Sequence, residues 1–388
     1  MALDFNLIGH QVKQMGNDLR ASADDRRDRI ERAREALLRE AGYWADWHER
    51  ASAAYAKSPW LLAAPIEPLD VRYPLPPCPP SYNLAAVDGS QIDLDRHGSV
   101  ECFLINIGEV LLSYGDHPDC VLRSKPRLAY KEDELVLRDD KGRQYTMAGN
   151  MVNAERDTAE GVALAELAAN LNIDAPRVAM QDGTLIRWAL SGLDPWVCKH
   201  FLSRYLDQGL NSLRLQGVPA CSYISRPRAP EVTGLARLIA DPTFAKANKP
   251  NGAGDPYRGV TDHMIYEDLG DGQRSPLFKS LSKINAEMYD EHAIHFFYLN
   301  VGRDLVRIEL PEWVAAEPAE VDLIHAVAYD QAQRGGGYPA ALARAHEQAV
   351  VRETDRRVFR QMLEHTLWHA RLSSGVSLKA DSKEWQRV

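Results

Sequence analysis

The chain has 388 residues, 45% of them hydrophobic and 26% charged, and its 46 basic and 55 acidic side chains give a formal net charge of −9. These globular proportions exclude a largely disordered chain, and the length predicts one large domain with additions, or two domains. The acidic balance argues against a protein that coats nucleic acid through bulk positive charge, but leaves a local basic groove open.

Cysteine usage and the absence of long apolar runs bear on the compartment. The five cysteines are scattered and odd in number, which argues against a disulfide framework or a structural zinc site. The first residues lack the basic start and apolar core of a signal peptide. No run approaches the roughly 18 consecutive apolar residues that a membrane span needs. The sequence therefore predicts a cytoplasmic protein with no membrane partner.

Residues 1–80 are predicted to form a helical N-terminal arm that ends in a proline-rich linker. The prolines of 73–83 forbid a helix and favour an extended tether, so we expect the second domain to cover 81–388. The charged residues of the arm predict a solvated outer face, with a docking helix or dimer arm as the alternative. Its apolar residues recur at three- and four-residue steps and share one helix face: Ile30, Ala33, Leu37, Ala41 and Trp44.

The order of elements after the linker predicts the fold class. Three strands come first, followed by alternating helices and strands, which is typical of an α/β protein with a mixed sheet flanked by helices. This order matches the ribonuclease H-like layout. The predicted strands cover 84–88 (stopping at Gly89), 100–114, 134–138, 177–182 and 219–225, and the predicted helices cover 153–171, 196–214 and 229–240.

The C-terminal third is predicted to add an insertion and a long helix. Residues 241–290 are rich in Gly, Pro, Asp and Lys, which is typical of a loop-rich insertion. Two strands are expected at 294–302 and 304–311. A C-terminal helix is expected over about 339–371.

Two similar turns carry the main chemical signal, AAVDGSQ at 85–91 and AMQDGTL at 179–185. In each, an apolar strand ends in an aspartate, Asp88 or Asp182, and a glycine follows. Two carboxylates at the ends of adjacent strands could share Mg²⁺ or Mn²⁺, although Asp-Gly is also a common turn dipeptide. The second motif also resembles the haloacid-dehalogenase signature, but Met180 occupies the nucleophile's position and removes that chemistry.

The helix between the two aspartates carries Glu155, Glu160 and Glu166. In a ribonuclease H-like sheet this helix directs a carboxylate towards the aspartate of the first strand. Glu160 is the preferred candidate because Arg156 precedes it by one turn, and Glu166 is the second. For any one of them, a surface salt bridge is the alternative role.

A glycine run near the C-terminus leads to Tyr338 and, eight residues on, His346. If a helix starts near Pro339, His346 lies about two turns inside it, where a structural histidine is the alternative interpretation. His292 and His295 have no third ligand nearby and are interpreted as structural. The chain lacks a P-loop motif, so we do not expect it to hydrolyse ATP.

Taken together, these motifs resemble the NurA family of nucleases from about residue 84 to about residue 360. The resemblance rests on AAVDGSQ, QDGTL, YISRPRAPEV (223–232), HFFYLNV followed by RIELP, and GGGYPAALARAHEQAV. It implies a Mn²⁺-dependent DNA nuclease with a ribonuclease H-like fold, commonly a homodimer. It also implies 5′-to-3′ exonuclease action on single-stranded and double-stranded DNA ends, with single-strand endonuclease activity as an addition. The implied partner is HerA, a hexameric translocase ATPase, in end resection and DNA repair.

The resemblance also implies roles for individual residues. Asp88, Glu160 and Asp182 match the metal-binding carboxylates, which would hold two ions of Mn²⁺ or Mg²⁺. Tyr338 and His346 match the C-terminal catalytic pair. Where the family often has a lysine, this chain has Arg226 and Arg228, which can clamp phosphate but cannot act as proton donors. The alternatives are a non-catalytic dimeric scaffold for DNA and the ATPase, or a defence nuclease on other nucleic acids.

Overall fold

A computed structural model describes residues 4–93, 100–243, 252 and 254–370. Three predicted regions extend beyond these residues: the arm at 1–3, the insertion at 244–251 and 253, and the C-terminal helix at 371. The chain divides into two compact units, Met1–Leu75 with Ile224–Glu309, and Pro76–Tyr223 with Leu310–Val388. Each unit combines segments that are distant in the sequence.

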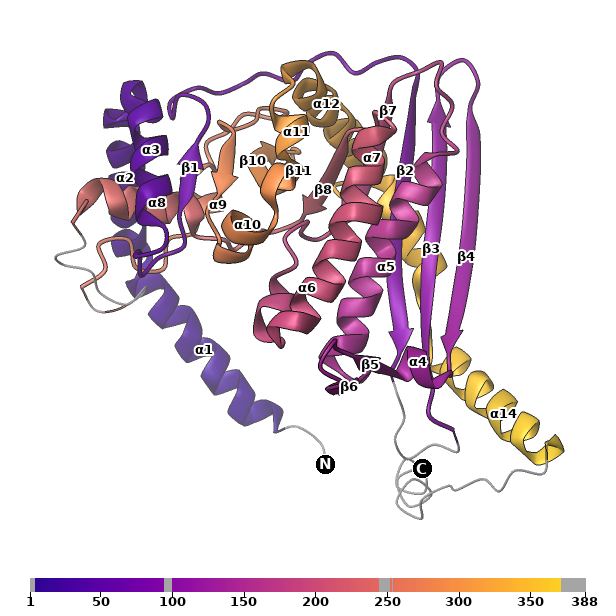
Figure 1. The fold of residues 1–388 in the computed structure, drawn as a ribbon. Helices are drawn as coiled ribbons and strands as arrows, with labels where there is room; N and C mark the ends of the chain where they lie inside the picture. The colour runs from indigo at the N-terminus through magenta and orange to yellow at the C-terminus, as the bar shows by residue number, and fades with distance from the viewer. Residues whose placement is uncertain (1–3, 94–99, 244–251, 253, 371–388) are drawn as a thin grey trace. The chain divides into compact units, whose positions relative to one another are not determined.

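The first unit joins the N-terminal arm to the middle of the chain (Figure 1). Its strand β9 pairs antiparallel with β1 of the arm on one side and with β10 on the other. The elements are α1 Phe5–Ala21, α2 Ala23–Arg39, α3 Trp44–Ala54, β1 Ala63–Pro65, α8 Glu231–Ala240, α9 Asp262–Ile265, β9 Phe278–Ser280, α10 Lys283–Met288, β10 Ile294–Asn300 and β11 Leu305–Pro311, the last reaching the unit boundary.

The predicted apolar face of the arm is buried in the core of this unit. Ile30, Ala33 and Leu37 belong to the same hydrophobic cluster as Leu235 of α8 and Phe296 of β10. The sequence predicts a separate arm, whereas in the structure residues 4–75 share a core with residues of 224–309. The difference arises because the pairing of β1 with β9 joins segments more than 200 residues apart, and the sequence order gives no sign of it.

The second unit contains a mixed sheet whose strands alternate with helices along the chain, and further helices follow the last strand. Its elements are β2 Tyr82–Ile92, β3 Phe103–Tyr114, β4 Asp119–Ala129, α4 Glu132–Leu135, β5 Val136–Arg138, β6 Gln144–Thr146, α5 Asn150–Ala168, β7 Arg177–Asp182, α6 Pro195–Arg204, a π-helical turn Tyr205–Leu210, α7 Asn211–Leu215, β8 Ala220–Ile224, α11 Glu312–Ala315, α12 Pro318–Arg334, α13 Ala340–Ala349 and α14 Glu353–His369.

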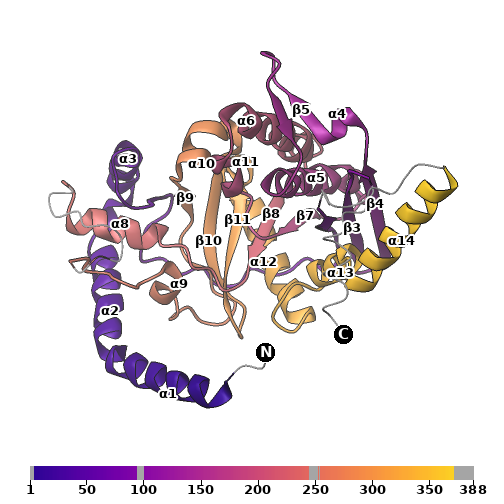
Figure 2. The same ribbon diagram turned by 90° about the horizontal axis from the view of Figure 1, so that it is seen from below.

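The sheet of the second unit has the order β8-β7-β2-β3-β4. β2, β3 and β4 form an antiparallel meander, and β7 and β8 are added parallel to β2. Helices α5 and α6 lie on one face, and α12 and α13 lie on the opposite face (Figure 2). The predicted mixed sheet flanked by helices is therefore confirmed.

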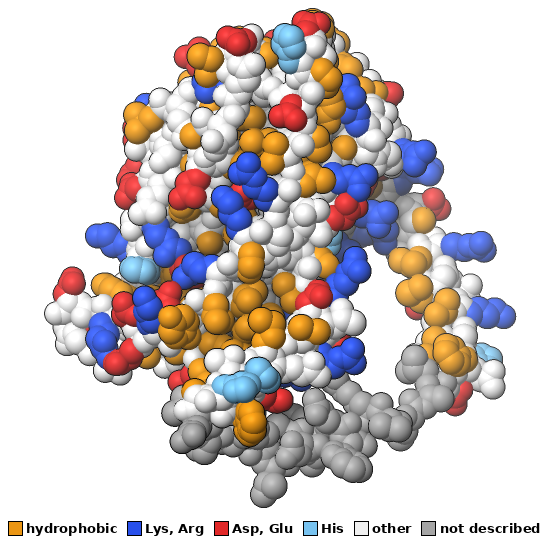
Figure 3. All heavy atoms as spheres, turned by 90° about the vertical axis from the view of Figure 1, so that its right-hand side faces the viewer, with side chains coloured by type: hydrophobic (Ala, Val, Ile, Leu, Met, Phe, Trp, Pro, Cys, Tyr) orange, Lys and Arg blue, Asp and Glu red, His pale blue; other side chains and the backbone are white. Residues whose placement is uncertain are grey.

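The third strand of the meander is not where the sequence predicts it. β4 covers Asp119–Ala129, whereas the predicted strand 134–138 overlaps α4 and the short β5, which pairs only with β6. β4 is exposed along almost its whole length, so it lacks the apolar alternation that reveals a half-buried strand. Figure 3 views this side of the molecule and shows Lys and Arg side chains interspersed with apolar and acidic ones.

The predicted C-terminal helix over 339–371 is two helices, α13 and α14, separated at 350–352. Side chains of the sheet bind the last carbonyl of α13. Ser90 Oγ and Asn106 Nδ2 both donate a hydrogen bond to Ala349 O. These side chains satisfy a backbone acceptor that a continuing helix would otherwise use. α13 is thereby fixed to β2 and β3. Within the described residues, no helix has the length and apolar character that crossing a membrane requires.

Candidate active site

Asp88 and Asp182 lie on neighbouring parallel strands. The last registered pair between β2 and β7 is Val87 with Gln181, and the two aspartates follow directly on their strands. Burial raises the pKa of Asp182, and the negative charge of Asp88 adds to this shift. The predicted juxtaposition of these two carboxylates is therefore present at this edge of the sheet.

The two glycines that follow the aspartates are required for different structural reasons. Gly183 has φ +75° and ends β7 in a turn, as the sequence predicts. Gly89 is different, because β2 continues to Ile92. A Cβ atom on Gly89 would lie 2.3 Å from Glu160 Oε1. Gly89 therefore permits the close approach of a carboxylate from α5 rather than a turn.

Glu160 is thus held directly against Gly89, the residue that follows Asp88. It is 7% exposed. Arg156 Nε lies 3.6 Å from its Oε1, and Gln181 Nε2 donates to its Oε2 at 3.3 Å. Burial raises the pKa of Glu160 to about 7; Asp88 contributes in the same direction, and Arg156 opposes the shift. A carboxylate with this pKa in a group of acidic residues marks a candidate functional site.

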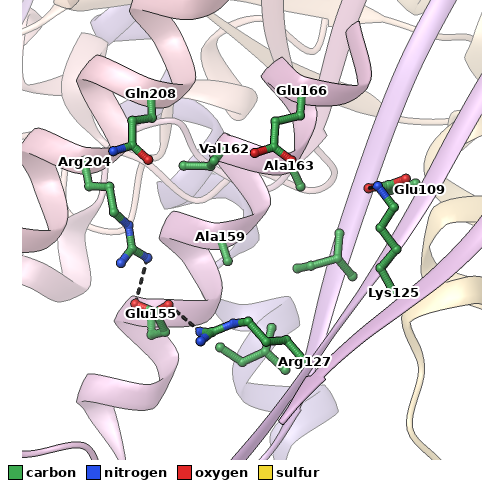
Figure 4. A pocket seen from close by; sticks show the side chains of 12 residues that line it. Glu109, Lys125, Arg127, Glu155, Ala159, Val162, Ala163, Glu166, Arg204 and Gln208 are labelled. Atoms are coloured by element: carbon green, nitrogen blue, oxygen red, sulfur yellow. Dashed lines mark hydrogen bonds and ion pairs between the residues drawn. The ribbon is translucent and has the colours of Figure 1, made fainter. Parts of the chain in front are cut away.

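The other two glutamates of α5 belong to a separate groove between α5 and strands β3 and β4. Its volume is about 420 Å³. Glu155 accepts from Arg127 Nη2 at 2.6 Å and from Arg204 Nη2 at 2.7 Å, while Glu166 lies exposed further along the same groove (Figure 4). Of the two candidates that the sequence left open, Glu160 is the one that lies beside Gly89 and Asp88.

His346 reaches Asp88 from the opposite face of the sheet. Its Nδ1 lies 2.7 Å from Asp88 Oδ2. Gly108 of β3 is paired with Asp88, and a Cβ atom on Gly108 would lie 2.2 Å from the carbonyl oxygen of Ala345. The glycine lets the backbone of α13 touch the strand, which brings His346 within hydrogen-bonding distance of the carboxylate.

Tyr338 holds the second aspartate. Its hydroxyl forms a hydrogen bond with Asp182, and burial together with this charge raises the pKa of Tyr338 well above its ordinary value. The ring of Tyr338 meets Tyr223 edge to face at 5.7 Å, and the Tyr223 hydroxyl donates to Gly337 O at 3.2 Å. Tyr338 is therefore a protonated donor to Asp182 with a fixed ring.

Five of the seven predicted site residues thus come together within the second unit: Asp88, Glu160, Asp182, Tyr338 and His346. The other two predicted residues, Arg226 and Arg228, belong to the first unit. Arg226 has a positive φ of 48°, its side chain is 88% exposed, and its Nε lies 3.6 Å from Asp304 Oδ2.

The donor set of this site fits a hard divalent cation. Three carboxylates from β2, α5 and β7 supply oxygen ligands, the chemistry that Mg²⁺ and Mn²⁺ prefer. Each is occupied by a protein partner: Asp88 by His346, Asp182 by Tyr338 and Glu160 by Gln181. No group of three or more His, Cys, Asp or Glu in the described part of the chain converges to hold an ion in this arrangement. Binding an ion would require the three carboxylates to move closer together than they are in this arrangement.

Sequence reasoning assigned no role to Gln181, which the structure places against Glu160. A signal for it exists in the motif AMQDGTL. Residues in a strand alternate between faces, so Gln181 is a polar residue on the face opposite Asp182, in a strand that is otherwise apolar at its centre. A buried amide at such a position requires a polar partner.

The comparison with known proteins decides the family. The sequence matches the NurA domain over residues 82–351, which is more than half of the chain. The chain belongs to the NurA family. Among solved structures, it is similar to the NurA nuclease from Sulfolobus solfataricus, with 12% identity, a TM-score of 0.45, and coverage of 84% of this chain and 92% of the other. It is also similar to a structure of NurA with manganese, with 11% identity, a TM-score of 0.38, and coverage of 76% and 91%. No curated protein matches the chain.

Proposed function

We propose that this NurA-family chain is a metal-dependent DNA nuclease that hydrolyses phosphodiester bonds. The observation that carries the proposal is the arrangement around Asp88, which has Glu160 on one side of β2, His346 on the other, and Asp182 on the adjacent strand. The strand order and directions of the second unit also support the ribonuclease H-like fold expected from the sequence.

Asp88, Glu160 and Asp182 would hold the cations, which we propose are two ions of Mn²⁺ or Mg²⁺. When bound, such ions would lower the pKa of an attacking water and neutralise charge on the phosphate. The three side chains start from a repulsive arrangement, since Asp88 raises the pKa of both Glu160 and Asp182. This repulsion is what a cation would relieve.

His346 and Tyr338 would act on the substrate side of the carboxylates. His346 is anchored through Nδ1 to Asp88, and its side chain is 64% exposed, so Nε2 would contact the scissile phosphate or donate a proton to the leaving oxygen. Tyr338 would orient Asp182 through its hydroxyl. Arg226 and Arg228 would clamp phosphate oxygens, which suits the planar guanidinium.

The finer properties rest on the family resemblance. We propose that the nuclease acts with 5′-to-3′ polarity, forms a homodimer, and works with a HerA-type hexameric ATPase in DNA end resection and repair. The free cysteines among the described residues support a reducing, cytoplasmic location. Co-purification of the chain with the HerA-like ATPase from the same genome would test the partnership, and separate elution of both proteins would contradict it.

The nuclease activity is tested with labelled single-stranded and double-stranded DNA in Mn²⁺, Mg²⁺ or EDTA. Asp88→Ala and Asp182→Ala should abolish cutting, while Asp133→Ala, an exposed control on α4, should cut like the wild type. Equal cutting by all variants would overturn the site assignment. A wild type that remains inactive in both metals, even with the ATPase, would support the alternative of a non-catalytic scaffold. Preferential cutting of RNA in competition would support a defence nuclease on other nucleic acids.

A further inference from the structure

Gln181 contacts Glu160 in only one possible orientation. Its Oε1 accepts from Arg187 Nη2 at 2.9 Å, and its Nε2 donates to Glu160 Oε2 at 3.3 Å. A guanidinium has no acceptor atom, so the amide oxygen of Gln181 must face Arg187. The amide nitrogen must then face Glu160. Gln181 is 1% exposed, which leaves water little access to this contact.

Arg187 is in turn fixed by the residues around it. It is 7% exposed, its guanidinium lies 4.1 Å above the ring of Tyr205, and Nη1 reaches Thr184 O at 3.4 Å. A planar cation over an aromatic face is a favourable arrangement when both groups are desolvated. These contacts hold the guanidinium of Arg187 in place beside Gln181.

Tyr205 connects Arg187 to α5, because its ring contacts both. It begins the π-helical turn after α6 and is fully buried. A Cβ atom on Gly161 would lie 2.4 Å from the Tyr205 ring, so the ring packs directly on the residue that follows Glu160. Single π-helical turns inside helices occur frequently at functional sites. The contacts thus run from Glu160 through Gln181, Arg187 and Tyr205 back to the neighbour of Glu160.

The two oxygens of Glu160 consequently have different surroundings. Oε2 is held by Gln181, whereas Oε1 lies against Gly89, beside Asp88. Oε1, which also lies 3.6 Å from Arg156 Nε, is therefore the oxygen that lies against β2, the strand that carries Asp88.

We propose that Gln181 and Arg187 are positioning residues for metal binding: they fix Oε2 of Glu160 through a directed amide, so that Oε1 is presented beside Asp88. The inference rests on the proposed metal-dependent function. Outer hydrogen-bond partners of metal ligands act in this way, by orienting the ligand and excluding other rotamers. Gln181 and Arg187 do not touch the substrate in this proposal.

The test measures Mn²⁺ affinity directly, by electron paramagnetic resonance of free Mn²⁺ during titration of the full chain. Gln181→Leu and Arg187→Met should weaken Mn²⁺ binding by about tenfold, the lower end for loss of an outer partner. Arg187→Lys keeps a donor for Gln181 and should recover part of the affinity. Gln208→Leu makes the same chemical change at an exposed position of the π-helical turn and should bind Mn²⁺ like the wild type.

Cleavage kinetics provide a second readout. The positioning variants should have a raised Mn²⁺ requirement and should approach the wild-type kcat when Mn²⁺ is saturating, which a general loss of structure would not produce. Gln181→Met replaces Gln181→Leu if the latter does not fold. Wild-type Mn²⁺ affinity in the Gln181 and Arg187 variants overturns the inference. If Asp88→Ala and Glu160→Ala also bind and cleave like the wild type, the proposed function itself fails, so the two failures are distinguishable.

Discussion

Gly89 is the residue on which the contact between Glu160 and β2 depends. Replacing it with alanine would put a Cβ atom 2.3 Å from Glu160 Oε1 and 2.9 Å from its Cγ, so the carboxylate must move. Displacing a catalytic group by about 1 Å can reduce the rate on the order of 100-fold. We expect Gly89→Ala to fold and to lose DNA cleavage to this extent, measured as kcat in Mn²⁺.

Gly192→Ala is the control for this substitution, because nothing lies within 4 Å of a Cβ atom at that position. It should retain wild-type cleavage. A Gly89→Ala variant that is as active as this control would show that the position of Glu160 is not required for catalysis.

Glu160 itself should reduce the stability of the metal-free protein. Burial raises its pKa from 4.5 to about 7, so between these pH values the unfolded chain releases the proton before the folded chain does. The contribution of Glu160 to the free energy of unfolding therefore decreases as pH rises from about 4.5 to about 7, and it does not change further above pH 7. At about 1.4 kcal/mol per pKa unit, the loss is about 3 kcal/mol. In EDTA at pH 8, Glu160→Gln should be more stable than the wild type by about this amount.

Denaturant unfolding at pH 5 and pH 8 measures this difference, which should shrink towards pH 5, where Glu160 is protonated in the folded protein. The exposed Glu166→Gln should show no such pH dependence. A Glu160→Gln variant less stable than the wild type at pH 8 would contradict the expected cost of ionising Glu160.

At the residue scale, the sequence carries a good part of this site. Asp88 and Asp182 are recognisable because each directly follows an apolar run, where an aspartate is not needed for the core, and Glu160 follows from the helical spacing to Arg156. Gln181 was not predicted, because its importance depends on Arg187 and Glu160 lying beside it. Such contacts between separate elements are not encoded in any local pattern.

At the scale of elements, the contact between α13 and β3 determines where His346 lies. A Cβ atom on Gly108 would lie 2.2 Å from Ala345 O and 2.6 Å from Ala349 N. Both are backbone atoms, so no rotamer change can relieve the clash and the helix must move away. We expect Gly108→Ala to lose about 1–3 kcal/mol of unfolding free energy, as for overpacked cores, and to lose cleavage because His346 leaves Asp88.

Thermal unfolding and a cleavage assay on the same preparation test this prediction, with Gly42→Ala as a control at a position with open space. Full activity in a destabilised Gly108→Ala variant would show that His346 does not need its contact with Asp88 for cleavage.

Two elements show where local pattern reaches its limit. Most of the predicted strands and helices follow apolar periodicity and occur near their predicted positions. β4 was not predicted because its side chains are mostly exposed and show no apolar alternation. The break between α13 and α14 was not predicted either, since 350–352 contain neither glycine nor proline. It arises where Ser90 and Asn106 take the carbonyl of Ala349, a tertiary contact.

At the scale of the whole molecule, sequence order and spatial grouping differ. The prolines at 73–83 are a visible boundary signal, and the first segment of the first unit ends among them, at Leu75. The return to that unit at Ile224 has a weaker signal, because only the short segment 225–230, with prolines at 227 and 230, separates β8 from α8. Domain organisation built from distant segments depends on pairings such as β1 with β9, which sequence order does not reveal.

The net charge of −9 bears on how the molecule binds DNA. Without metal, the carboxylates at the proposed site repel phosphate, and few phosphate contacts remain to release counterions. We therefore expect weak binding of single-stranded DNA in EDTA. With two or three such contacts, the affinity should fall about tenfold between 50 and 200 mM salt. Fluorescence anisotropy of a labelled oligonucleotide measures both quantities.

Ca²⁺, used as a cation that supports little catalysis, should strengthen binding in the wild type but not in Asp88→Ala, because cations at a carboxylate cluster create a phosphate-binding centre. Tight binding in EDTA that salt does not change would contradict this account of the charge.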